Sequence, residues 1–438
     1  MSDIRLSNAQ ARAVADIKNW FKNDTPKKPC WYLAGYAGVG KSTVVRHIVD
    51  DLGLSFEGPV PSVVAATYTA KAALVLSRMG TPATTIHKLI YITRRHSKAE
   101  VDFIRREIEG MKEALRAIED AALRIAAEAE IARREDAIRG MFELKTTINP
   151  MSPARDAKLI VLDEISMVNE SIGRDLLSFG TPILVIGDPG QLPPIKGQGF
   201  FTQHQPDTML TEIHRQAWDS PIVRLATMAR QGRPIPFGRW SDTVWKMSKE
   251  KIADPAMLLS ADIVLCGLNR TRFMLNNEMR RAGGLGGILP LPTDRLICLK
   301  NDYEHGLVNG LFMTMRELRT IDANRFQAII ETEDGETIGE TGEPHEDDEA
   351  PHGIPCYAGH FLDHAAFDEN RNYRDHWLKQ KLVEATFGYA ISVHKSQGSG
   401  FNNVIFWDDG WGAGRPEQRR QLVYTAITRA VSGLLIVE

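Results

Sequence analysis

The chain has 438 residues, 43% of them hydrophobic and 25% charged, with a formal net charge of −3 at pH 7. This length exceeds what one hydrophobic core supports, so we expect two or more domains, and no apolar run approaches the roughly 18 residues of a membrane-spanning helix. The four cysteines are far apart and the first ten residues hold no apolar signal core. Both features predict a cytoplasmic protein with free thiols.

The first elements surround a glycine-rich stretch. A helix is predicted over residues 8–23, with Ser7 as its N-cap, and an apolar run at residues 29–34 predicts a buried strand. The next residues, 35–43, read GYAGVGKST and have the spacing of a phosphate-binding loop that opens a helix. We expect Lys41 to reach the β- and γ-phosphates and Ser42 to hold Mg²⁺. The other candidates for nucleotide contact are Gly35, Gly38, Val39, Gly40 and Thr43.

The stretch from 97 to 145 differs in composition from its surroundings. It is rich in Ala, Glu, Arg and Ile, and its apolar residues alternate in steps of three and four over more than three heptads. One long helix and a helical hairpin turning near Glu119-Asp120 both fit this pattern, as does a solvated helix with no function. Because neither Gly nor Pro marks a turn there, the pattern favours one long helix.

Two further strands are followed by polar residues. Asp163 and Glu164 follow the apolar run 159–162 in a Walker B arrangement, with Asp163 suited to Mg²⁺ and Glu164 to orienting and deprotonating water. Gln191 follows the strand 181–186 in a proline-rich loop, where its amide suits sensing a γ-phosphate or positioning water. This alternation of strands and helices predicts a parallel α/β sheet with sites at the carboxyl ends of its strands.

The second half of the chain repeats the α/β pattern around a β-rich segment. Strands are predicted at 261–266, 388–393, 404–407 and 434–437, and a helix at 417–428. Between them, residues 294–383 contain β-type runs and turns at Asn309-Gly310 and Asp334-Gly335, which predicts a small inserted β-barrel. Arg215 and Arg429 are candidates for arginine fingers that stabilise transition-state charge.

One cluster of cysteine and histidine lies in this β-rich segment. Cys356, His360 and His364 stand four residues apart, with His345 and His352 nearby. Because this spacing matches no common zinc motif, we expect no metal there.

The ordered motifs resemble those of superfamily 1 DNA helicases, within them the RecD/Dda-like 5′-to-3′ group. They are Leu6-x3-Gln10, the phosphate-binding loop, and residues 66–72, 162–167, 187–194, 215–216, 392–398 and 423–429. The resemblance implies an α/β fold of two RecA-like P-loop domains with parallel sheets. The first comprises 1–96 and 150–235 with a helical insertion, 97–149; the second comprises 236–299 and 383–438 with an inserted SH3-like β-barrel, 300–382.

The resemblance also implies residue roles. Gln10 contacts adenine, Gln191 couples the γ-phosphate to DNA, and Gln397 and Gly398 lie near the nucleotide, while Arg215 and Arg429 are the fingers. A channel for single-stranded DNA is lined by Thr67, Lys71, Thr84, His87, Ser392 and His394. Hydroxyl, imidazole and amine groups suit phosphate contacts, although His394 also suits a core position that holds its own loop. Phe103 and Phe142 are the aromatic candidates for a strand-separating wedge.

The function so implied is an ATP-dependent DNA helicase, a DNA-stimulated ATPase that uses Mg²⁺, acts as a monomer on single-stranded DNA and on its junctions with duplex, and works in the cytosol of a bacterial or phage-infected cell. The alternative is an ATP-dependent remodeller or loader whose helical arm, residues 97–145, binds a protein partner. A third hypothesis, a P-loop kinase of a small molecule, predicts ATPase activity that is indifferent to DNA.

Overall fold

A computed structural model describes residues 6–94, 98–116, 120–142, 145–165, 168–193, 199–212, 219–252, 254–302, 305–322, 325–339, 353–361 and 382–438. The chain divides into two compact units: residues 87–152, and residues 1–86 together with 153–438. Within these ranges, no helix combines the length and apolar character needed to cross a bilayer.

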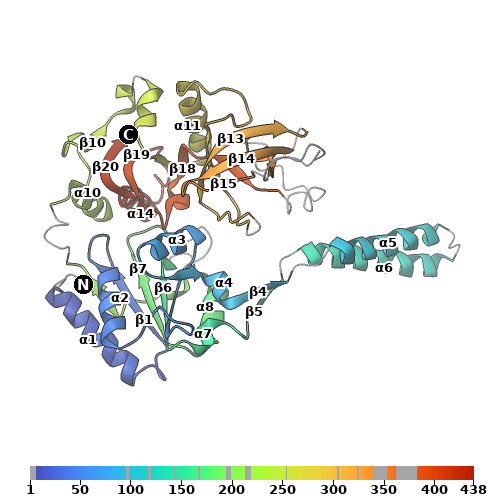
Figure 1. Ribbon diagram of the computed structural model, residues 1–438, viewed down its shortest axis with the longest axis horizontal. Helices are drawn as coiled ribbons and strands as arrows, with labels where there is room; N and C mark the ends of the chain where they lie inside the picture. Colours follow the sequence, from blue (N-terminus) through green and yellow to red (C-terminus); the bar gives the residue numbers. More distant parts are fainter. Residues whose placement is uncertain are drawn as a thin grey trace. The chain divides into compact units, whose positions relative to one another are not determined.

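The larger unit begins with a parallel sheet of order β3-β2-β6-β7-β1-β8 (Figure 1). Its elements are α1 (Asn8–Asn23), β1 (Cys30–Gly35), α2 (Lys41–Asp51), β2 (Val63–Thr67), α3 (Ala70–Arg78), β3 (Ala83–Thr85), α7 (Pro153–Asp156), β6 (Leu159–Asp163), α8 (Glu170–Leu177), β7 (Ile183–Gly187) and β8 (Thr208–Leu210). Ser7 caps α1, as the sequence predicted, and the structure shows that it shares a capping box with Gln10. One face of α2 is buried with α1 in the apolar core of this sheet, so the loop before α2 is held rigidly.

A second sheet in the same unit has the order β18-β11-β19-β20-β10-β9. Its strands run parallel except for β9, which pairs antiparallel with β10. Its elements are α10 (Pro221–Arg230), β9 (Gly238–Arg239), β10 (Val244–Met247), β11 (Ile263–Cys266), α11 (Asn269–Ala282), β18 (Ala390–Ser392), β19 (Phe401–Trp407), α14 (Pro416–Ile427) and β20 (Ala430–Val437). The chain is therefore an α/β protein with two parallel-sheet cores, which confirms the RecA-like core of the predicted fold class.

An antiparallel sheet with its own apolar core stands where the β-barrel was predicted. Its strands are β12 (Arg295–Cys298), β13 (Phe312–Thr320), β14 (Arg325–Thr332), β15 (Thr337–Ile338), β16 (Ile354–Tyr357) and β17 (Ala385–Phe387). The turn at Asp334-Gly335 joins β14 to β15, with Gly335 at a φ of 81° that favours glycine. Closure of this sheet into an SH3-like barrel remains a prediction.

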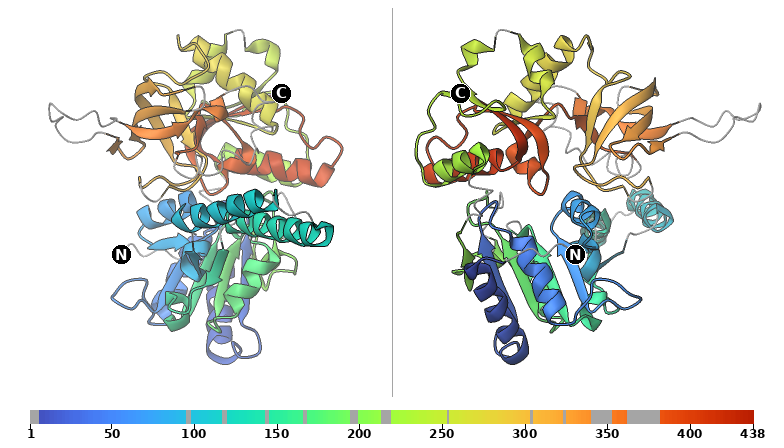
Figure 2. Two further views of the ribbon diagram at one scale, coloured as in Figure 1. Left: turned by 90° about the vertical axis from the view of Figure 1, so that its right-hand side faces the viewer. Right: turned by 60° about the vertical axis from the view of Figure 1, so that its left-hand side comes forward.

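The smaller unit holds two helices rather than the single long helix that we favoured. It contains the end of α4 (Ile86–Ile90), β4 (Tyr91–Arg94), α5 (Lys98–Leu115), α6 (Ala121–Phe142) and β5 (Lys145–Ile148). Figures 1 and 2 show α5 and α6 side by side, and Arg134 of α6 pairs with Glu107 of α5 at 2.9 Å.

The long-helix prediction was wrong because Asp120 restarts the helix without any Gly or Pro. Its Oδ1 accepts a hydrogen bond from the N–H of Leu123 at 3.0 Å, which is an N-cap interaction for α6. Ile108 of α5 and Ile131 of α6 are both buried.

Candidate active site

The loop between β1 and α2 has the backbone that a phosphate cradle requires. Gly38 and Gly40 have φ values of 81° and 77°, a left-handed conformation that glycine adopts without strain. Lys41 Nζ donates to the carbonyl oxygens of Gly35 and Tyr36 at 2.7 and 3.2 Å. The lysine thus stands inside the curve of the loop, where an anion at the helix N-terminus would meet it.

Gln10 braces this loop from α1. Its Nε2 donates to the carbonyl of Val39 at 3.0 Å, and its Oε1 accepts from the N–H of Ser7 at the same distance. Val39 is buried beneath the loop, whereas Ser42 at the start of α2 is exposed, with Thr43 half-buried beside it. Gln10 therefore positions the phosphate-binding loop whether or not it also contacts adenine.

Asp163 and Glu164 stand at the carboxyl end of β6, as predicted. Desolvation raises the pKa of both carboxyl groups, while the Lys41 ammonium opposes that rise. Glu164 also has a φ of 52°, which is uncommon outside glycine and costs roughly 1–3 kcal/mol. Backbone strain and a perturbed pKa at one carboxylate are features of functional sites.

Arg429 approaches this carboxylate from the second sheet. Its guanidinium is the largest influence that opposes the desolvation of Glu164 and lowers that residue's pKa. Its side chain is buried and donates to the carbonyls of Thr425 and Ser399, both at 3.2 Å. The structure therefore brings Arg429 and Glu164 within electrostatic reach, whereas Arg215 lies outside the described residues.

The loop from 187 to 193 is held by residues of the second sheet. The N–H of Leu192 donates to Thr425 Oγ1 at 3.0 Å, and Gln397 Nε2 donates to the carbonyl of Leu192 at 3.0 Å. In the part of the chain that the structure describes, the buried Oε1 atoms of Gln191 and Gln397 have no hydrogen-bond partner. Because an unpaired buried acceptor is costly, two amide oxygens here are suited to a donor from a ligand or its water.

Tyr424 connects this loop to the phosphate-binding loop. Its hydroxyl accepts from the N–H of Ala37 at 2.9 Å and donates to Asp188 Oδ2 at 2.6 Å. Its ring lies so close to Gly190 that an added Cβ would be 2.9 Å from the Tyr424 ring. Burial and then the Asp188 carboxylate raise the pKa of Tyr424 far above its usual value, so the hydroxyl stays protonated. Sequence reasoning gave Tyr424 and Asp188 no role, although both stand in the quoted motifs.

The candidate DNA contacts lie around α3 and at the end of β18. Thr67 is buried and donates through Oγ1 to the carbonyl of Thr69 at 2.7 Å, and Thr84 lies on the neighbouring strand β3. Gly398 packs on α3, where a Cβ would be 2.8 Å from Ala72 Cβ. These contacts place Gly398 beside the predicted channel residues.

Lys71 was expected to face phosphate, and in the structure it pairs with Glu333 in the turn between β14 and β15. Burial lowers the pKa of Lys71 to about 8. Ser392 accepts from the N–H of Lys395, and His394 is half-buried, with a pKa lowered by burial. His87 belongs to the smaller unit, where its ring lies 5.8 Å from that of Tyr91.

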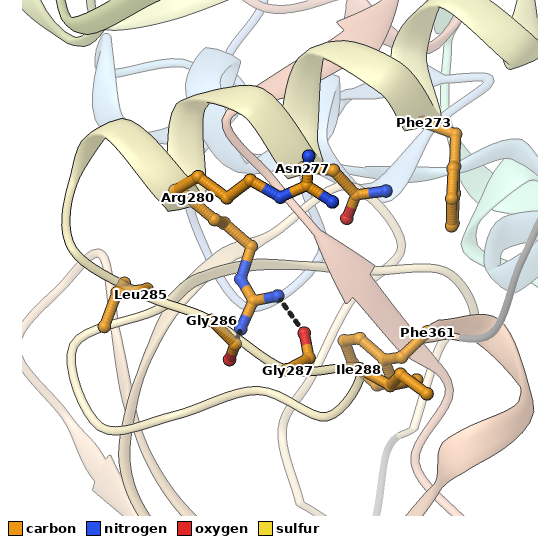
Figure 3. A pocket seen from close by; sticks show the side chains of 9 residues that line it. Phe273, Asn277, Arg280, Leu285, Gly286, Gly287, Ile288 and Phe361 are labelled. Atoms are coloured by element: carbon orange, nitrogen blue, oxygen red, sulfur yellow. Dashed lines mark hydrogen bonds between the residues drawn. The ribbon is translucent and has the colours of Figure 1, made fainter.

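Two other features lie outside this group. A cavity of about 380 Å³ beside α11 is lined by Arg280, which donates to the carbonyl of Gly287 at 2.8 Å (Figure 3). The Arg280 guanidinium is also committed to Asp294 at 2.7 and 2.8 Å. Cys356 is buried and His360 pairs with Glu384, whereas His345, His352 and His364 lie outside the described residues. Over the ranges described, no three His, Cys, Asp or Glu side chains are grouped to hold a metal.

The parallel sheets and glycine loop together define a P-loop protein with two α/β cores. The chain belongs to the AAA domain family, whose model matches residues 5–243. Residues 387–437 match the UvrD-like helicase C-terminal domain.

Among curated relatives, the ATP-dependent RecD2 DNA helicase of Deinococcus radiodurans is 26% identical over 306 residues, which are 64% of this chain and 36% of that protein. The chain thus spans little more than a third of this relative. These matches confirm the resemblance to RecD-like superfamily 1 helicases.

Solved structures of Pif1 helicases are also similar. The Bacteroides protein in complex with ADP-AlF3 and ssDNA is 16% identical, with 99% of this chain and 92% of that one covered and a TM-score of 0.49. The Candida albicans protein is 17% identical, with 99% and 94% covered and a TM-score of 0.47. Because both scores are below 0.5, the fold rests on the sheet topology and the site on its own geometry.

Proposed function

We propose that this chain is an ATP-dependent DNA helicase that hydrolyses Mg-ATP between its two parallel sheets. The observation that carries the proposal is the meeting of three groups at one site: Lys41 of the phosphate-binding loop, Glu164 at the end of β6, and Arg429 from the second sheet. Transfer of a phosphoryl group to water uses a loop that holds the phosphates, a base that activates the water and an arginine that stabilises the transition-state charge.

The roles follow from the chemistry of each side chain. Lys41 and the loop N–H groups hold the phosphates, and Glu164 orients the attacking water and takes its proton. Gln191 offers an unpaired amide oxygen to that water, and Arg429 stabilises charge on the transferring group. Arg215 is the second finger of this proposal.

The residues present suit a bound magnesium ion. Ser42 and Asp163 supply hard oxygen donors beside the phosphate-binding loop, which Mg²⁺ prefers, and the ion would neutralise phosphate charge. The adenine side is assigned to Gln10, with Gln397 and Gly398 approaching from the second sheet.

ATP hydrolysis can drive movement along DNA because the second sheet contacts both the nucleotide site and the residues proposed to bind DNA. Gln397 binds the 187–193 loop, while its neighbour Gly398 packs on α3, beside Thr67 and Lys71. A change in phosphate occupancy that shifts the second sheet therefore shifts the grip on a strand held by Thr67, Lys71, Thr84, Ser392 and His394. His87, in the smaller unit, is a further candidate for DNA contact. We assign the direction as 5′-to-3′, the acting form as a monomer and the location as the cytosol.

The test is ATP turnover of the full chain with and without single-stranded DNA, beside Lys41→Ala. We expect strong stimulation in the wild type and none in the variant. Turnover that is equal with and without DNA would point instead to a small-molecule kinase or another DNA-independent ATPase.

A second function has one observation in its favour. The helical hairpin carries large apolar side chains in solvent, with Phe103 59% and Leu123 63% exposed. Such residues suit a protein partner, as in an ATP-dependent loader. Deleting residues 97–145 separates the two functions: unwinding that survives while a partner is lost assigns the hairpin to partner binding, whereas loss of unwinding alone assigns it to strand separation.

A further inference from the structure

A second cavity, of about 320 Å³, opens at the carboxyl ends of the second sheet. Three neighbouring parallel strands end there: β18 at Ser392, β11 just before Gly267, and β19 shortly before Trp411. Leu192 of the 187–193 loop completes the wall. The carboxyl edge of a parallel sheet is where α/β proteins bind ligands, and this volume is at the small end of the range for such pockets.

The backbone and the base of the side chain of Trp411 are held in place by neighbouring residues. Asp409 Oδ2 accepts from the N–H groups of Gly267 and Leu268 at 3.1 and 2.7 Å, and its Oδ1 accepts from the N–H of Trp411 at 3.2 Å. Gly267 is required, because a Cβ there would lie 2.3 Å from Trp411 Cβ. A fixed aromatic ring binds with little loss of conformational entropy.

The rest of the cavity lining is uncharged near the Trp411 ring and positively charged at the edge of the cavity. The His394 ring lies 5.3 Å from that of Trp411 and nearly perpendicular to it, at 74°. Burial lowers the pKa of His394, so the imidazole is neutral at pH 7. The side-chain amides of Asn269 and Gln418 also line the cavity, together with the exposed Arg415.

These groups match the chemistry of one nucleotide within a strand. An aromatic face stacks with a nucleobase, amides bond to its edge, and an exposed guanidinium pairs with a backbone phosphate. An apolar side chain of a protein partner in this cavity would form no hydrogen bonds with the two side-chain amides or with Arg415. We propose, on the basis of the proposed function, that this cavity captures one unstacked nucleobase of single-stranded DNA on Trp411.

The site links DNA to the nucleotide loop. Leu192 and Gln191 are neighbours in one loop, and that loop is bonded to Thr425 and Gln397 of the second sheet. Because the pocket wall includes Leu192, its shape depends on how the second sheet meets this loop. A change in that contact would therefore change the pocket.

The experiment combines a protein change with a DNA change. Binding of the full chain to a fluorescent oligo-dT and to an abasic oligonucleotide of equal length is measured by anisotropy at fixed salt. We expect Trp411→Leu to weaken oligo-dT binding about tenfold, within the range for one base–aromatic stack, and to leave abasic binding nearly unchanged. Trp411→Phe should retain most of the affinity, and Trp245→Ala, at an exposed tryptophan on β10, should bind both oligonucleotides like the wild type.

A second variant guards against a folding defect. Gln418→Tyr fills the pocket from α14, removes the bond that Gln418 Oε1 accepts from Arg415 at 3.4 Å, and should produce the same base-dependent loss. Equal losses on both oligonucleotides, or no loss with either variant, would overturn the pocket. If the wild type shows no DNA-stimulated ATP turnover, the proposed function itself fails; stimulated turnover without a base-dependent loss refutes the pocket alone.

Discussion

The hydroxyl of Tyr424 joins the phosphate-binding loop to the loop that carries Gln191, so removing it should uncouple ATP turnover from DNA. Tyr424→Phe keeps the buried ring and deletes two hydrogen bonds, one from the N–H of Ala37 at 2.9 Å and one to Asp188 Oδ2 at 2.6 Å. A bond to a charged group contributes about 1.5–3 kcal/mol and a neutral one about 0.5–1.5 kcal/mol. We take about 2 kcal/mol as the stabilisation lost by the arrangement in which Tyr424 joins the two loops. This loss lowers the population of the joined arrangement about 30-fold relative to the arrangement in which the loops are separated.

The assay is steady-state ATP turnover at saturating single-stranded DNA, compared with turnover without DNA. We expect the DNA-stimulated kcat of Tyr424→Phe to fall by about 30-fold, and a double-mutant cycle with Asp188→Asn to show strong coupling. Tyr32→Phe is the matched control, because the buried Tyr32 hydroxyl has no hydrogen-bond partner among the described residues. The reasoning would be refuted if DNA stimulated ATP turnover equally in Tyr424→Phe and the wild type and if the double-mutant cycle showed no coupling between Tyr424 and Asp188.

Three further changes test separate parts of the site. Glu164→Gln should lower DNA-stimulated hydrolysis by about 10²–10⁴ with ATP binding retained; wild-type turnover would remove Glu164 as the base. Arg429→Ala should lose about 10³-fold or more in hydrolysis while a fluorescent ATP analogue still binds, and loss of binding alone would argue against a finger. Burial lowers the pKa of Lys71 to about 8, so its charge is present at pH 7 and lost by pH 9. DNA affinity should therefore weaken about fivefold over that range, and Lys71→Arg should reduce the change because arginine stays charged, while Lys395, whose pKa burial also lowers to about 8, still titrates; parallel pH profiles would show that Lys71 does not touch phosphate.

Features that depend on neighbouring residues were predictable from the sequence. The capping box of Ser7 and Gln10, the glycine-rich loop before α2, and the acidic pair after β6 all follow from local spacing. Each is specified by residues within one strand–turn–helix segment, where periodicity and capping chemistry decide the structure.

Features that depend on distant residues were not predictable from the sequence. The pairing of Lys71 with Glu333, in the turn after β14, depends on a residue 262 positions away in the chain. The role of Tyr424 likewise depends on its hydrogen bond to the distant Asp188. The prediction of one long helix failed for a different reason. Asp120 caps α6 in the structure, but an aspartate is also compatible with the exposed surface of a continuous helix. Trp411 carried no motif, and its fixed position depends on Gly267 from another strand.

In the proposed function, ATP hydrolysis at this site moves the chain along single-stranded DNA. The most direct measurement is strand displacement by the full chain on paired duplexes that differ only in a 5′ or a 3′ overhang, with ATP and Mg²⁺. We predict unwinding of the 5′-overhang duplex and none with Lys41→Ala. No displacement of either duplex, together with ATP turnover that single-stranded DNA leaves unchanged, would contradict the account.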